Sequence, residues 1–206
     1  MNSNRIRYKQ REFNLNDVKE LKELNWTLEK YGCGPTSIAN VLVNFGFDIN
    51  PIDVARKILF DKEGKFDRTY LRKKGINSDG LIYCLERLKK EDKVDICYEI
   101  LKIDFSNPTN KKEEIISFIQ KGYMAIIHVG PSQKSPLSFS KNGHYLVISD
   151  VDEKDNFYVI NSNKTGDKQL EIPFDYDTII KNMIGRKDSF NFLLIRRSNK
   201  QWILNI

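Results

Sequence analysis

The segment YGCGPTSIANVLVNFG, residues 31–46, places a cysteine between two glycines at the start of an apolar pattern with helical spacing. Pro35 suits a first helical turn and Gly46 suits a stop, so we expect a helix over residues 35–45. Cys33 would lie at the N-terminus of this helix, where unpaired N–H groups and the helix dipole stabilise an anion. A thiol there should ionise more easily than a free one, whose pKa is about 8.5.

The rest of the chain divides into a helical part and an extended part. Helical spacing and capping residues predict further helices over residues 14–24, 50–59, 77–90 and 109–123. Beyond residue 122, runs rich in β-branched and aromatic residues predict strands over residues 123–129, 144–151, 156–161 and 191–197. A helical half followed by a sheet half indicates an α+β fold.

Length and spacing favour one domain over residues 1–206, built from two lobes. No repeat or low-complexity linker divides the chain, and we expect only residues 1–12 to be flexible or loosely packed. Clefts commonly form between two such lobes. The sequence therefore predicts a site where the helical lobe meets the sheet.

Composition excludes several classes of function. The 34 basic and 28 acidic residues give a net charge of +6, but the lysines alternate with acids, which is typical of a solvated surface rather than of nucleic-acid binding. Three cysteines without a CxxC pair predict neither a disulfide framework nor a zinc site, and we expect no cofactor or metal. The absence of a signal sequence and of an 18-residue apolar run predicts a cytoplasmic protein without a membrane span.

A thiolate nucleophile needs a base, and the chain contains two histidines. His128 lies inside the apolar run AIIHVG, which is typical of a core histidine in a buried strand. His144 opens a predicted strand directly after Gly143, at the end of a polar, serine-rich loop. The start of a strand beside such a loop is a usual place for a catalytic group, so His144 is the predicted base.

Hairpin geometry locates a third residue. If residues 144–151 and 156–161 pair through the turn between them, His144 and Asn161 emerge at the same open end of the hairpin. Asn161 would then orient the imidazole, as the third group does in Cys-His-Asn sites. Asp150 is the alternative orienting residue, since Asp152 would lie in the turn at the far end.

Together these segments resemble the papain-like C39 peptidases, including the stand-alone C39-like members. GCGPTSIANVL is similar to their nucleophile motif, and GHYLVISDVDEKDNFYVIN is similar to their histidine strand with the turn and strand that follow. The resemblance covers roughly residues 25–165. It implies a papain-like fold in which Cys33 is the nucleophile, His144 the base and Asn161 the orienting residue.

The resemblance also implies an oxyanion-stabilising glutamine six residues before the cysteine. That position is occupied by Thr27, and loss of such a donor costs about 100- to 1000-fold in rate elsewhere. The Thr27 hydroxyl, the nearby Asn25 or the Cys33 backbone N–H are the replacements that the sequence offers.

The main functional hypothesis is a thiol hydrolase that cleaves a peptide or amide bond in a peptide or protein substrate. The same residues can instead pass the acyl group to an amine or thiol, as in papain-like acyltransferases. A third hypothesis is a peptide-binding protein on an inactivated peptidase scaffold, which the Thr27 replacement motivates. A nucleic-acid-binding module rests only on the net charge.

Overall fold

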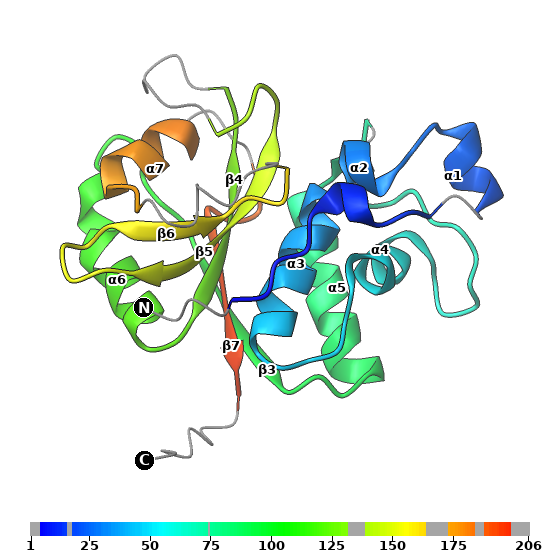
Figure 1. Cartoon of the computed structure of the whole chain (residues 1–206), viewed down its shortest axis with the longest axis horizontal. Helices are drawn as coiled ribbons and strands as arrows, with labels where there is room; N and C mark the ends of the chain where they lie inside the picture. Colours follow the sequence, from blue (N-terminus) through cyan, green and yellow to red (C-terminus); the bar gives the residue numbers. More distant parts are fainter. Residues whose placement is uncertain are drawn as a thin grey trace.

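A computed structural model gives the fold, and it describes residues 5–15, 18–73, 75–131, 139–163, 173–183 and 188–198. Helices gather on one side of the molecule and a sheet with two covering helices occupies the other (Figure 1). The α+β arrangement expected from the sequence is confirmed. In the described part of the chain, no helix is long and apolar enough to cross a bilayer.

The helical lobe comes from the first half of the chain. After a 3-10 turn, η1 (Gln10–Glu12), it contains α1 (Lys19–Glu23), α2 (Leu28–Tyr31), α3 (Cys33–Asn44), α4 (Pro51–Leu59) and α5 (Ser78–Glu91). A short antiparallel pair, β1 (Leu71–Arg72) and β2 (Gly75–Ile76), precedes α5. The predicted helix over residues 14–24 is realised as α1 alone, and its expected cap, Asn16, lies outside the described residues.

The second lobe is an antiparallel sheet with the strand order β3-β7-β4-β5-β6. Its strands are β3 (Ile96–Leu101), β4 (Met124–Val129), β5 (His144–Val151), β6 (Phe157–Ile160) and β7 (Phe192–Arg197). The 3-10 turn η2 (Pro108–Lys111) leads into α6 (Lys112–Gln120), and α7 (Tyr176–Met183) precedes β7. The four strands predicted from the sequence are confirmed within two residues, and β3 is additional.

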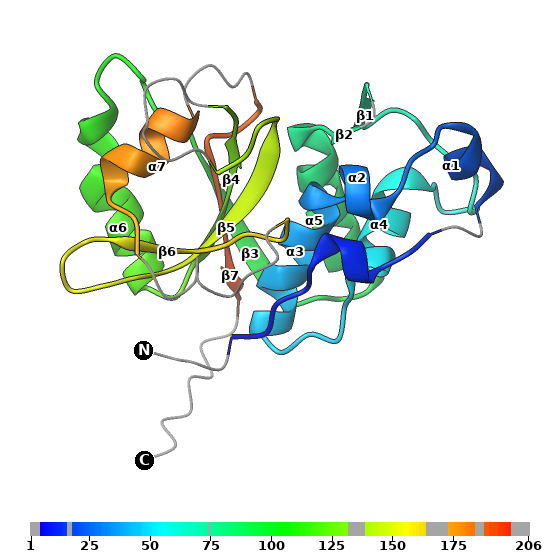
Figure 2. The same ribbon diagram turned by 45° about the horizontal axis from the view of Figure 1, so that its top comes forward.

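Alternation along β5 explains how this sheet separates two hydrophobic cores. Tyr145 and Val147 pack into the core that includes α3, whereas Leu146 and Ile148 pack into the core that includes α6. Successive strand residues point to opposite faces, so one strand serves both cores. Both views accordingly show β5 between α3 and α6 (Figure 1, Figure 2). Helix α3 is therefore held against the strand that begins with His144.

Candidate active site

Cys33 is the first residue of α3, two residues earlier than the sequence pattern placed the start of the helix. The glycines beside it are required by close packing. A Cβ atom at Gly32 would lie 2.5 Å from a side-chain carbon of Leu28, and one at Gly34 would lie 2.9 Å from a side-chain carbon of Leu81. A Cβ at Gly32 would also lie 2.6 Å from the backbone oxygen of Leu28, so a larger residue does not fit there, whereas at Gly34 the Leu81 side chain would have to move.

The cysteine sulfur lies beside the start of β5. The ring of Tyr145 is within 3.5 Å of the position that a Cβ of Gly34 would take, and the backbone N–H of Tyr145 hydrogen-bonds to the Cys33 thiol. Because Tyr145 directly follows His144, the fold brings the nucleophile motif and the histidine strand together. The residues come from the two lobes, as the sequence predicted.

The environment of the thiol differs from the sequence-based expectation. Cys33 is half-buried, and burial raises the pKa of its thiol above the ordinary value. The backbone N–H groups of Tyr145, Gly34 and Cys33 itself lower this pKa, but by less than burial raises it. At the start of this helix, burial therefore outweighs the backbone N–H groups and disfavours the thiolate.

His144 is only 3% exposed and its ring bonds to Asn161. His144 Nε2 lies 2.8 Å from Asn161 Oδ1. An amide oxygen accepts hydrogen bonds, so this contact assigns the proton to Nε2 in the neutral ring. Nδ1 is then the nitrogen that can accept a proton.

Strand register explains how residues 17 positions apart meet. Val147 pairs with Ile160, so Asn161 comes opposite Leu146, two residues along β5 from His144. A register shift between Ile148 and Asp150 moves the pairing relative to a regular hairpin. His144 and Asn161 therefore lie at the open end of the hairpin, as predicted, and they are diagonal rather than directly opposite neighbours.

The alternative candidates have other partners. Asp150 lies beyond the register shift, toward the turn, and forms an ion pair with Arg5 at 3.1 Å. His128 Nδ1 lies 2.7 Å from Asp188 Oδ2, and its ring stacks on Tyr145 with centroids 4.4 Å apart. Asp150 and His128 are therefore each paired with a residue outside the proposed triad.

The two residues predicted to stabilise an oxyanion have local roles. Thr27 is the N-cap of α2, where its hydroxyl oxygen accepts a hydrogen bond from the Lys30 backbone N–H at 3.2 Å. Asn25 is exposed and has a left-handed φ of 49°, with Lys30 Nζ 3.5 Å from its side-chain oxygen. As oxyanion donors, both stay a prediction.

Sequence reasoning missed Gln10, which lies 23 residues before the cysteine. Its side chain is 4% exposed, and its Nε2 donates to the carbonyl oxygen of Glu29 in α2 at 2.5 Å. Its Oε1 accepts from the hydroxyl of Ser162, the residue after Asn161, at 3.2 Å. Gln10 thus bridges the chain before Cys33 and the chain after Asn161. The only sequence signal is a glutamine near the N-terminus, because the contacts depend on the fold.

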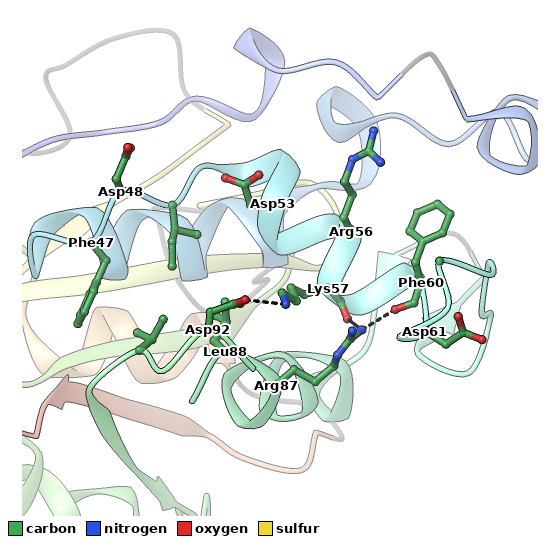
Figure 3. Close-up of a pocket in the computed structure, with 13 residues that line it drawn as sticks. Phe47, Asp48, Asp53, Arg56, Lys57, Phe60, Asp61, Arg87, Leu88 and Asp92 are labelled. Atoms are coloured by element: carbon green, nitrogen blue, oxygen red, sulfur yellow. Dashed lines mark hydrogen bonds and ion pairs between the residues drawn. The ribbon is translucent and has the colours of Figure 1, made fainter. Parts of the chain in front are cut away.

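A hollow of about 740 Å³ lies elsewhere, between α4 and α5 (Figure 3). Two of the cations that line it are paired: Lys57 Nζ lies 2.9 Å from both Glu91 and Asp92, and Arg87 donates to the carbonyl oxygens of Lys57 and Phe60. Within the described residues, no cluster of histidine, cysteine and acidic side chains is suited to hold a metal ion.

Comparison with known proteins shows the family of the chain. Residues 7–185 match the model of the Peptidase_C39 like family, which is most of the chain. The chain belongs to the C39-like peptidase family. The matched region contains Cys33, His144, Asn161 and Gln10. No curated protein matches the sequence.

Solved structures place this C39-like chain among papain-like folds. A crystal structure described as that of a C39-like peptidase from Bacillus anthracis is 15% identical, with a TM-score of 0.59 over 97% of this chain and 98% of the other. The peptidase domain of Streptococcus ComA, a bifunctional ABC transporter of a quorum-sensing pathway, is 13% identical. It has a TM-score of 0.49 over 81% of this chain and 90% of the other. The first likeness supports the papain-like α+β fold expected from the sequence.

Proposed function

We propose that this C39-like protein is a cysteine peptidase whose triad is Cys33, His144 and Asn161. The observation that carries the proposal is the 2.8 Å contact of His144 Nε2 with Asn161 Oδ1, made where the strand bearing His144 meets the Cys33 thiol. Membership of the C39-like family supports a hydrolase of this kind. The substrate would be a peptide or protein.

In the proposed mechanism, His144 Nδ1 takes the proton of the Cys33 thiol as the sulfur attacks the carbonyl carbon of the scissile bond. The carbonyl electrons move to oxygen, giving a tetrahedral intermediate. The imidazolium returns its proton to the leaving amine as the C–N bond breaks, which leaves a thioester on Cys33. Water, deprotonated by His144, then attacks the thioester, and the acid product leaves as the thiol re-forms.

Asn161 would keep the imidazole in the required orientation throughout this cycle. Its Oδ1 accepts a hydrogen bond from His144 Nε2–H and a second one from the Asn163 backbone N–H at 3.1 Å. The second bond holds the amide itself in place. A fixed acceptor stabilises the imidazolium and prevents the ring from turning its protonated nitrogen toward the sulfur.

We also propose Gln10, rather than Thr27 or Asn25, as the side-chain donor to the oxyanion. A primary amide has two N–H groups, and the bond to the Glu29 carbonyl uses one of them. The resemblance to papain-like peptidases implies a glutamine in this role, and Gln10 is a buried glutamine bonded to both chain segments that flank the site. Its presence weakens the case for an inactivated binding scaffold, which rested on Thr27.

The test is mass spectrometry of a peptide library incubated with the wild type, with Cys33→Ser and with Cys97→Ser. The account expects cleavage by the wild type and by Cys97→Ser, and none by Cys33→Ser. Products joined to an added amine or thiol in place of water would indicate an acyltransferase. Binding without any turnover by the wild type would contradict the peptidase and favour the binding scaffold.

A further inference from the structure

The N-terminal segment of residues 5–10 lies along helix α3, in contact with the helix that carries the cysteine (Figure 2). Two asparagine side chains make this contact, and each forms two hydrogen bonds to one residue of the segment. Asn44 accepts from the Ile6 backbone N–H at 3.2 Å and donates to the Ile6 carbonyl at 2.8 Å. Asn40 accepts from the Tyr8 N–H at 2.6 Å and donates to the Tyr8 carbonyl at 3.2 Å.

The geometry of the two elements explains why this pairing is regular. Residues i and i+4 of a helix lie on one face, separated by a rise of about 6 Å. Residues i and i+2 of an extended chain point to the same side, separated by about 6.6 Å. The side-chain amides of Asn40 and Asn44 therefore make the pairs of hydrogen bonds to Ile6 and Tyr8 that the backbone of a neighbouring β-strand would make.

This pairing fixes the register of the segment. A shift by two residues along α3 would move every later residue by about 6.6 Å. The residue placed next in the same direction is Gln10, whose backbone N–H donates to the Ser162 carbonyl at 3.2 Å. Its side-chain bonds to Glu29 and Ser162 depend on the same register.

We infer that Asn40 and Asn44 are positioning residues for catalysis, which act by setting the register that brings Gln10 to the active site. This inference rests on the proposed function, in which Gln10 donates to the oxyanion. The two asparagines touch neither the substrate nor the reacting atoms. They give the cysteine helix a second role, because the helix that presents the nucleophile also aligns the segment that carries its oxyanion donor.

The distinguishing experiment is a double-mutant cycle on the full chain with Asn44→Ala, Gln10→Ala and the double variant. Asn44 is preferred to Asn40 because it is only half-buried, whereas Asn40 is 1% exposed. We expect Gln10→Ala to lower kcat about 100-fold with little change in KM, and Asn44→Ala to lower it about 10-fold. If Asn44 acts through Gln10, the double variant equals Gln10→Ala alone.

A matched control and a second readout separate positioning from general destabilisation. Asn50→Ala removes the same amide from the N-cap of α4, and it should leave kcat per folded molecule unchanged. Hydrogen exchange of the Ile6 to Gln10 amides should be faster in Asn44→Ala than in Asn50→Ala. Equal exchange rates in Asn44→Ala and Asn50→Ala would overturn the inference. So would a double variant whose loss of kcat is the product of the two single losses, because Asn44 and Gln10 would then act independently.

The failure of this inference can be told from failure of the proposed function. If the wild type cleaves peptides but Asn44→Ala retains its kcat, the positioning role is wrong and the peptidase stands. If the wild type cleaves nothing, the proposed function is wrong, and the catalytic role of Gln10 and of the two asparagines is overturned with it.

Discussion

Two regions of the molecule contain polar side chains packed against a helix: the hollow between α4 and α5, and the junction where Cys33 at the start of α3 meets β5. They differ in whether these side chains have hydrogen-bond partners. In the hollow, Arg87 bonds to Glu91 and to two carbonyl oxygens at the end of α4. At the junction, Thr36 Oγ1 and Tyr145 OH are buried without a hydrogen-bond partner among the described residues. Thr36 lies in the first turn after Cys33, and Tyr145 follows His144.

This difference in hydrogen bonding supports a structural role for the hollow and a chemical role for the junction around Cys33. Buried polar groups in proteins are normally hydrogen-bonded, so a saturated network such as that of Arg87 is explained by stability alone. Unpartnered groups cost stability and are retained where something else is gained. Stability alone therefore accounts for the hollow, and the unpartnered groups support the proposed site around Cys33.

The largest expected effect comes from the two histidines. His144→Ala should lower kcat by about 10⁴-fold or more, because the proposed mechanism loses the group that moves both protons. His128→Ala removes an equally sized ring, but one bonded to Asp188, and should change kcat per folded molecule by less than about threefold. Peptide cleavage assays on both variants, normalised to the folded fraction, make the comparison. Comparable losses of kcat in His144→Ala and His128→Ala would contradict the assignment of His144 as the catalytic base.

A second effect concerns the hollow. Arg87→Leu removes the donor to the carbonyl oxygens of Lys57 and Phe60 and leaves the Glu91 carboxylate bonded to Lys57, and it should lower the free energy of unfolding by about 3 kcal/mol. Urea unfolding measures the loss. Lys89→Ala, an exposed lysine on the same helix, is the control and should cost less than about 0.5 kcal/mol. Cleavage activity per folded molecule should stay at the wild-type level in both variants, and a selective loss of activity in Arg87→Leu would assign the hollow a function.

A smaller effect is the pH dependence of stability. Hydrogen bonds from Arg87, and then from Lys57, lower the pKa of Glu91 to about 2 from its ordinary value of 4.5. A depressed carboxyl pKa stabilises the fold above the unfolded value, and this stabilisation is lost as pH falls from about 4.5 toward about 2. Urea midpoints measured between about pH 6 and pH 3 should fall more steeply for the wild type than for Glu91→Gln. Parallel curves would show that Glu91 does not carry this dependence.

Local patterns in the sequence predicted the elements that carry the proposed triad. The spacing of apolar residues after Cys33 predicted α3, and hairpin symmetry placed His144 and Asn161 at one open end. These predictions succeeded because helical period and strand pairing act over short ranges of sequence. The register shift near Ser149 changed the facing pairs without separating the two residues.

Other features depend on tertiary contacts and could not be read from the sequence. Gln10 reaches Glu29 and Ser162 from a segment that Asn40 and Asn44 bond to α3, residues far from it in the sequence. The flexibility expected for residues 1–12 stays a prediction, to be judged against these contacts. The pKa of Cys33 was misjudged because a helix start favours the thiolate, whereas burial, which only the fold determines, opposes it more strongly.

The most direct test of the central claim, that Cys33 and His144 act as a pair, is the pH dependence of Cys33 alkylation by iodoacetamide. Site-resolved mass spectrometry can follow the reaction, with Cys97 as a reference within the same chain. In the wild type, the imidazolium should stabilise the thiolate, so Cys33 reacts readily at about pH 6. In His144→Ala, burial keeps the thiol pKa raised, and the reaction should require alkaline pH. Superimposable profiles for the wild type and His144→Ala would contradict the account.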